Sequence, residues 1–327
     1  MRLLAATGDG VCVLEDRDGT WEARLRLPGS GIQCLAADPA HRPIVFAGSA
    51  GQGLFRSADA GETWQRLDSP AASVFSVAVS AADGAVYAGC EPSSIFKSGD
   101  GGATWRELPA LRELPSAPSW SFPPRPWTSH VRWIAPSPHD PGVLLAGIEL
   151  GGVMYSGDGG ESWADHRPGA QRDVHALAWH PNVPGRAYEA GGGGAAWSRD
   201  GGRSWEPADE GRDRHYTWAL AVDPADPERW YVSASPGPRQ AHSPGRADAF
   251  VYRWQGEGPW ERLAGGLPQP LESMVYALAF AAGRLVAGLA DGRVYSSSDG
   301  GDRWQLVAPA GSRPERITAL APVEEGP

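Results

Sequence analysis

Side chains that could do chemistry gather at one position of a pentapeptide that recurs along the chain. Seven segments share an apolar fourth residue and an alanine at the fifth position: Ile32–Ala36, Val74–Ala78, Val131–Ala135, Val174–Ala178, Thr217–Ala221, Val275–Ala279 and Ile317–Ala321. Their second residues differ, and these are Gln33, Phe75, Arg132, His175, Trp218, Tyr276 and Thr318. Arginine binds anions, imidazole exchanges protons near neutral pH, and aromatic faces pack against flat ligands. Packing would favour repetition, so this divergence indicates a binding site. The position just before the segment adds His130, Asp173 and Tyr216.

Three glutamates follow or interrupt the next apolar segments and could supply acid–base chemistry. Glu91 and Glu149 follow AGC and AGI, so they occupy matching positions of neighbouring units. Glu189 stands where the other units keep a small residue. A buried carboxylate is costly unless it is paired, and Arg132 or His175 is the expected partner. Two such carboxyls could cleave a glycosidic bond if their separation were roughly 5 Å or 6.5–9.5 Å. We therefore name these three glutamates as candidate catalytic residues.

Each candidate also has a purely structural explanation. Glu149 and Arg132 could form a buried ion pair that bridges two units. His175 could be an interior imidazole with its hydrogen bonds satisfied. Trp218 and Tyr276 could simply fill space between units. The choice between the two explanations depends on whether these side chains share a cavity.

One octapeptide recurs through the chain and sets its architecture. Its copies are SADAGETW ending at Trp64, SGDGGATW at Trp105, SGDGGESW at Trp163, SRDGGRSW at Trp205 and SSDGGDRW at Trp304, with weaker copies at Trp21 and Trp260. The usual spacing is about 43 residues, close to the length of four short strands with their turns. The aspartate can accept backbone N–H groups in a tight turn, and the glycine allows positive φ. A residue repeated in every unit serves the unit, so these aspartates are expected to be structural.

Each unit shows four segments with alternating apolar residues, which predicts a four-stranded antiparallel sheet. We name these strands A to D from the inside outward; in one unit they are Ile32–Ala36, Ile44–Gly48, Gly53–Ser57 and Thr63–Leu67. The last A segment, Ile317–Ala321, has no B, C or D after it, whereas Arg2–Ala6 begins a B–C–D set with no A. We therefore predict an all-β, seven-bladed β-propeller, one domain over residues 1–327, in which Ile317–Ala321 pairs with Arg2–Ala6 and closes the ring.

The octapeptide pattern is the Asp box, also called the BNR repeat, and the chain resembles the sialidase-like, BNR-repeat propellers over nearly its whole length. That group includes sialidases, xyloglucan-active glycoside hydrolases, sortilin-type receptors and a photosystem II assembly factor. The chain looks most like bacterial BNR-repeat proteins that are often labelled glycosyl hydrolases. The resemblance implies the propeller fold and a glycan-type ligand. It carries over no catalytic residue, because the chain has seven units, no Arg-Ile-Pro motif and only one propeller.

Two insertions predict which face of the propeller carries the site. Residues Leu111–Thr128 lengthen a D–A connection and Pro236–Asp248 a B–C connection. Strands alternate in direction, so both connections lie on the same face, opposite the octapeptide turns. Long loops on one face of a repeat array are commonly binding loops. The aromatic residues of the first insertion, Trp120, Phe122 and Trp127, are expected to form a lid.

Composition narrows the partners. The formal net charge of −10 argues against nucleic acid and against an anionic membrane surface. Only three cysteines are present, and the first ten residues read as a strand entering a turn, so we expect a cytoplasmic protein. Three histidines, His130, His175 and His215, could converge on a metal, but their spacing fits no metal motif, so no metal and no cofactor are assigned.

Three functions follow from these observations. The first is binding of a small molecule or a glycan at the loop-rich mouth of the central channel. The second is a glycoside hydrolase or lyase that uses the paired glutamates. The third is a scaffold for protein assembly. A deep ring of mixed polar and aromatic residues favours the first.

Overall fold

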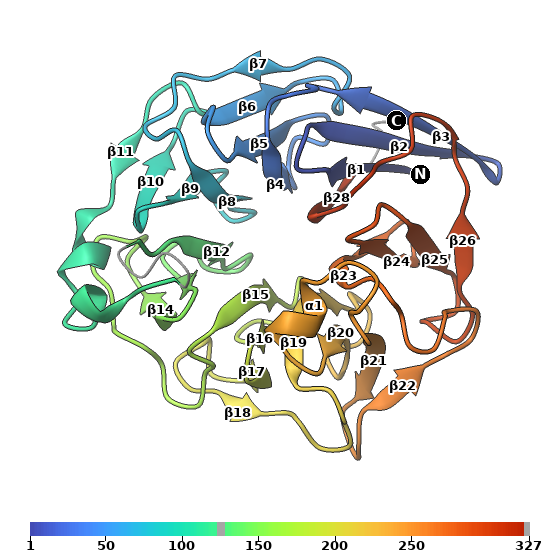
Figure 1. Cartoon of the computed structure of the whole chain (residues 1–327). Coiled ribbons are helices and arrows are strands. Elements are labelled where there is room, and N and C mark those ends of the chain that lie inside the picture. Colours follow the sequence, from blue (N-terminus) through green and yellow to red (C-terminus); the bar gives the residue numbers. More distant parts are fainter. Residues whose placement is uncertain (123–127, 324–327) are drawn as a thin grey trace.

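The computed structural model describes residues 1–122 and 128–323, and within these ranges seven antiparallel sheets surround a central opening (Figure 1). The predicted seven-bladed β-propeller is confirmed. Each sheet is one blade, and apolar layers between neighbouring blades form the core; Phe46 and Leu54 of one blade, for example, pack with Val77, Val86 and Ala88 of the next.

The strands occur in the predicted order. The inner A strands are β4 (Ile32–Ala37), β8 (Val74–Val79), β12 (Val131–Pro136), β15 (Val174–Trp179), β19 (Tyr216–Val222), β23 (Val275–Ala281) and β28 (Ala319–Val323). The B strands are β5 (Val45–Ser49), β9 (Val86–Cys90), β13 (Leu144–Ile148), β16 (Ala187–Gly191), β20 (Arg229–Ser235), β24 (Arg284–Leu289) and β1 (Arg2–Ala6). The C strands are β6 (Leu54–Ser57), β10 (Ser94–Ser98), β14 (Gly152–Ser156), β17 (Gly194–Ser198), β21 (Phe250–Gln255), β25 (Val294–Ser297) and β2 (Val11–Arg17).

The outer D strands are shorter than predicted. They are β7 (Gln65–Arg66), β11 (Arg106–Glu107), β18 (Glu206–Pro207), β22 (Glu261–Leu263), β26 (Gln305–Val307) and β3 (Thr20–Arg26). In the blade of β12–β14, an isolated bridge between Tyr155 and Ala164 takes the place of the D strand. All D strands but β3 are two or three residues long, because they have a neighbour on one side only; β3, which β27 covers on its outer side, has seven residues. The tryptophan that ends an octapeptide, such as Trp64, directly precedes the D strand, except that Trp21 lies within β3.

The two ends of the chain complete one blade. β28 pairs antiparallel with β1, and Leu4 faces Ala321 in the register. The closing strand therefore begins two residues later than the predicted Ile317. A short strand β27 (Ala310–Gly311) adds to β3 in parallel and makes this sheet five-stranded. In Figure 1 the red β28 lies beside the dark blue β1 and closes the ring.

The octapeptide turns are held by their own side chains. The hydroxyl of Ser98 donates to Asp100 Oδ1 at 2.8 Å and accepts the Gly102 N–H at 2.8 Å. The Asp100 carboxylate also accepts the backbone N–H of Thr104, and Trp105 Nε1 donates to the Gly102 carbonyl. Gly102 has a φ of +91°, which disfavours any other residue there. These aspartates are occupied within their own turns, as expected for a structural role.

A bulge interrupts the inner strand of six blades at the position that diverges in sequence. The pairing of A with B shifts between Ile32 and Cys34, Val74 and Ser76, Val131 and Trp133, Val174 and Ala176, Thr217 and Leu220, and Val275 and Ala277. An extra residue in one strand bends it locally and turns its side chain in a new direction. The second residue of these six A segments is thereby released from the ladder, and Thr318 of the seventh lies just before β28.

The insertions form short helical turns. One 3-10 turn, Pro109–Glu113, leads into the first insertion and another, Ala117–Ser119, lies within it, while the second insertion contains α1 (Pro238–Ala241). Figure 1 shows α1 near the central opening, where it contacts β20. No helix in the described residues is long and apolar enough to span a membrane.

Candidate functional site

The second residues of all seven A segments converge on one cavity. Gln33, Phe75, Arg132, His175, Trp218, Tyr276 and Thr318 all line it, together with neighbouring residues of the same strands. Its volume is about 140 Å³. An engineered cavity of about 150 Å³ is known to hold benzene, so this space accommodates one ring-sized group. Any larger ligand would have to extend out of the cavity toward the loops.

His130 stands between two of the three candidate glutamates. Its Nε2 lies 2.7 Å from Glu149 Oε2, and its Nδ1 lies 3.8 Å from Glu91 Oε2. The imidazole is buried, stacks on Phe75 with ring centres 3.9 Å apart, and meets the edge of Phe122. The ring therefore occupies the space between Glu91 and Glu149, where a glycosidase would need room for a glycosidic bond.

Glu149 is held as a carboxylate. Burial opposes its ionisation, but the hydrogen bond from His130 and the nearby charge of Arg132 outweigh burial and lower its pKa. Arg132 Nε lies 3.9 Å from Glu149 Oε2. An ionised carboxylate cannot serve as the proton donor of a hydrolase at neutral pH.

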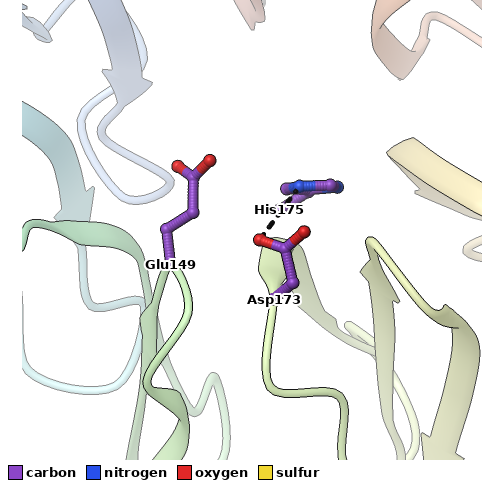
Figure 2. Close-up of side chains that lie close together, drawn as sticks. All are labelled: Glu149, Asp173 and His175. Carbon is purple, nitrogen blue, oxygen red and sulfur yellow. Dashed lines mark ion pairs between the residues drawn. The ribbon is translucent and has the colours of Figure 1, made fainter. Parts of the chain in front are cut away.

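A second cluster joins Glu149 to the next blade. Figure 2 shows Glu149 and Asp173 with their carboxylates near the His175 ring. His175 Nε2 lies 3.4 Å from Asp173 Oδ1, and its Nδ1 lies 2.6 Å from the carbonyl oxygen of Thr217. Asp173 immediately precedes a recurring segment, as His130 does, and this position before the strand marked it in the sequence. Nothing in the sequence indicated that its carboxylate would lie beside His175.

Arg132, Trp218 and Tyr276 form a continuous wall of the cavity. The Arg132 guanidinium lies over the Trp218 ring, 4.7 Å from its centre. Trp218 in turn packs against Tyr276 with ring centres 5.2 Å apart. Because the Arg132 side chain remains 22 % exposed, it is accessible to an anionic or hydrogen-bonding ligand. Gln33 lines the cavity too, and its amide donates to the Val74 carbonyl.

The second insertion contributes a residue that sequence reasoning missed. His242 follows α1, and its two ring nitrogens lie 2.8 Å from the hydroxyls of Tyr216 and Tyr276. Two hydrogen bonds thus tie this loop to two inner strands beside the cavity. The signal in the sequence was the single imidazole within Pro236–Asp248.

Glu189 does not join the other candidates. It is fully buried between blades, and its carboxyl accepts the backbone N–H of Gln171 rather than pairing with Arg132 or His175. Burial raises its pKa to about 8, so it is neutral at physiological pH. Its partners in the sheet are Leu177 and Ala196, and it is not among the residues that line the cavity. The expected ion pair with Arg132 or His175 is therefore wrong.

The lid predicted from the first insertion is not formed by Trp120. This side chain is buried in an apolar cluster with Leu111 and Ile148, and its Nε1 donates to Ser116 Oγ. Phe122 does approach the site through its contact with His130. Trp127 lies outside the described residues. His215 is exposed, and among residues 1–122 and 128–323 no group of three histidines could hold a metal.

Comparison with known proteins establishes the fold but no family. No family model matches the sequence, and no curated protein matches it. Among solved structures, a GH74 xyloglucanase from Xanthomonas campestris aligns with a TM-score of 0.65 at 20 % identity, over 84 % of this chain and 45 % of that one. An ancestral GH74 enzyme aligns with a TM-score of 0.65 at 16 % identity, over 95 % of this chain and 40 % of that one. YCF48 bound to D1 peptide aligns with a TM-score of 0.57 at 20 % identity, over 84 % and 81 %.

At this identity, similarity shows the fold alone. The chain spans less than half the length of the two GH74 structures, so their activity does not transfer with the fold.

Proposed function

We propose that this protein binds a small, oxygen-rich ligand, such as a sugar ring or a carboxylate-bearing metabolite, at the loop-rich mouth of its central channel. The observation that carries the proposal is the convergence of seven non-equivalent side chains on one cavity of about 140 Å³. Arg132 supplies hydrogen-bond donors, and Trp218 and Tyr276 supply faces for a ring. We place the protein in the cytoplasm, which its three unpaired cysteines support.

The structure supports ligand binding better than it supports hydrolysis, in which the three candidate glutamates would be the catalytic residues. His130 fills the space between Glu91 and Glu149. Glu189 keeps a proton but is buried away from the cavity. The GH74 neighbours favour a glycan among the possible ligands, whereas the peptide in the YCF48 structure favours a scaffold role. Both ligand classes therefore belong in the experiment.

The proposal predicts that a ligand will stabilise the protein through Arg132. In a thermal-shift screen of sugars, dicarboxylates and short peptides, a ligand at about 100 times its Kd adds about 2.7 kcal/mol, or on the order of 4 °C for a chain of this length. We expect Arg132→Ala to abolish the shift. Arg303→Ala, an exposed arginine in an octapeptide turn on the opposite face, is the matched control and should retain it. An equal shift in both variants would place the binding site elsewhere.

A further inference from the structure

Glu149, Asp173 and His175 together offer three ligand atoms at the junction of two blades. One atom from each residue lies within 4.8 Å of the other two (Figure 2). Glu149 follows β13, Asp173 precedes β15, and His175 is the bulged residue of β15. Each side chain is thus held by a strand end or a bulge on the rigid wall of the propeller.

The orientation of His175 leaves a nitrogen lone pair directed at this group. Its Nδ1 faces the Thr217 carbonyl oxygen at 2.6 Å, and a carbonyl can only accept, so Nδ1 carries the proton. The side chain is completely buried, and its Nε2 makes no hydrogen bond. Asp173 Oδ1, which is also an acceptor, lies 3.4 Å from Nε2. Two acceptors this close repel each other, and a cation bound between them would remove that repulsion.

We infer that Glu149, Asp173 and His175 bind a divalent transition-metal ion of the Zn²⁺ or Mn²⁺ class. A mixed set of one imidazole and two carboxylates suits these ions, whereas Ca²⁺ and Mg²⁺ prefer oxygen alone. Two ligands about 2.1 Å from a tetrahedral metal lie about 3.4 Å apart. The separation of Asp173 Oδ1 and His175 Nε2 has this value. No metal is expected from the sequence, because its histidines have no metal-site spacing.

The groups behind the ligands match those of metal sites. A metal-bound histidine usually donates its second ring N–H to a carbonyl or carboxylate, and His175 does so to Thr217. Glu149 is fixed by its hydrogen bond with His130 at 2.7 Å. Three protein ligands leave at least one coordination position for water or for an atom of a bound molecule. The cation site does not depend on the ligand proposed for the cavity.

The variant Arg132→Ala has different expected effects on cation binding and on binding of the cavity ligand, so it separates this inference from the proposed function. Its guanidinium approaches Glu149 at 3.9 Å and therefore competes with a cation for that carboxylate. Arg132→Ala should leave cation binding intact or strengthen it, although the same change should abolish binding of the cavity ligand. Failure of one proposal can thus be told from failure of the other.

The test is isothermal titration of the EDTA-treated, dialysed full chain with Zn²⁺, Mn²⁺ and Mg²⁺. We expect one Zn²⁺ or Mn²⁺ per chain, at least tenfold weaker binding in Asp173→Asn and in Glu149→Gln, and weaker binding of Mg²⁺ by the wild type. Asp18→Asn, at an exposed turn between β2 and β3, is the matched control and should bind like the wild type.

A Co²⁺ titration adds a spectroscopic readout, because coordination by His175 and the carboxylates gives visible absorption bands that Asp173→Asn should lose. Stoichiometric binding that both Asp173→Asn and Glu149→Gln retain would overturn the inference. Absence of binding by the wild type would overturn it as well.

Discussion

A chain that ends at Ser312 is expected to lose its cooperative folding. Such a chain lacks β28 and the buried side chains of Ile317, Ala321 and Val323. Burial of a valine or an isoleucine stabilises by about 1.5–3 kcal/mol each, and β1 would also lose its ladder partners. The loss is on the order of 5 kcal/mol or more, against a typical total stability of about 5–15 kcal/mol. The open edge of β1 would also promote aggregation.

Urea denaturation followed by tryptophan fluorescence measures this effect. A chain that ends at Val323 keeps β28 and is the appropriate control. If the chain ending at Ser312 unfolded at nearly the same urea concentration as this control, closure of the ring would contribute little to stability, contrary to our account.

Glu189→Gln is expected to remove a large part of the pH dependence of stability. The folded chain holds the Glu189 proton up to a pKa of about 8, whereas the unfolded chain releases it near the ordinary value of 4.5. Between these values the folded state binds one more proton, so the free energy of unfolding falls by roughly 1.4 kcal/mol per pH unit as pH rises. This contribution is fully present below pH 4.5 and is lost by about pH 8. An amide has no such proton to lose.

The measurement is the free energy of unfolding of wild type and Glu189→Gln between pH 5 and pH 8. Relative to the wild type, the variant should gain on the order of 4 kcal/mol across this window. Glu206→Gln, at an exposed position of β18, should show no such gain. A constant difference between Glu189→Gln and wild type at every pH would mean that Glu189 is ionised in the folded protein.

The repeat made the fold predictable from sequence. The octapeptides gave the number of blades, and the unmatched segments at the two ends predicted the pairing of β28 with β1. The D strands were predicted too long because alternation of residues continues past the point where pairing stops. An outer strand is hydrogen-bonded to a neighbour on one side only, so an alternating apolar pattern is not enough to keep its end paired.

The candidate site was predicted in part, for physical reasons. Divergence at the second position of the A segments identified the residues of the cavity wall. It did so because a bulge occurs at this same position in six blades and turns the side chain toward the cavity. Trp120 was misassigned because an aromatic residue in an insertion can cover a site or fill a core. Leu111 and Leu114 are three residues apart, so they lie on the same side of a helical turn. This spacing indicates that the insertion packs into the core with Trp120. Glu189 was misassigned because its hydrogen-bond partner, the backbone N–H of Gln171, lies in a loop whose position cannot be predicted from the repeat.

The central claim is that the diverging second positions of the A strands receive a ligand. Crystallographic screening with small sugar and carboxylate fragments tests it most directly. We predict fragment density in the cavity between Arg132, Trp218 and Tyr276, with a polar group of the fragment on the guanidinium. Fragments bound only at other hollows, such as the one between Asp291 and Arg313, with the channel cavity free of fragments, would contradict the claim.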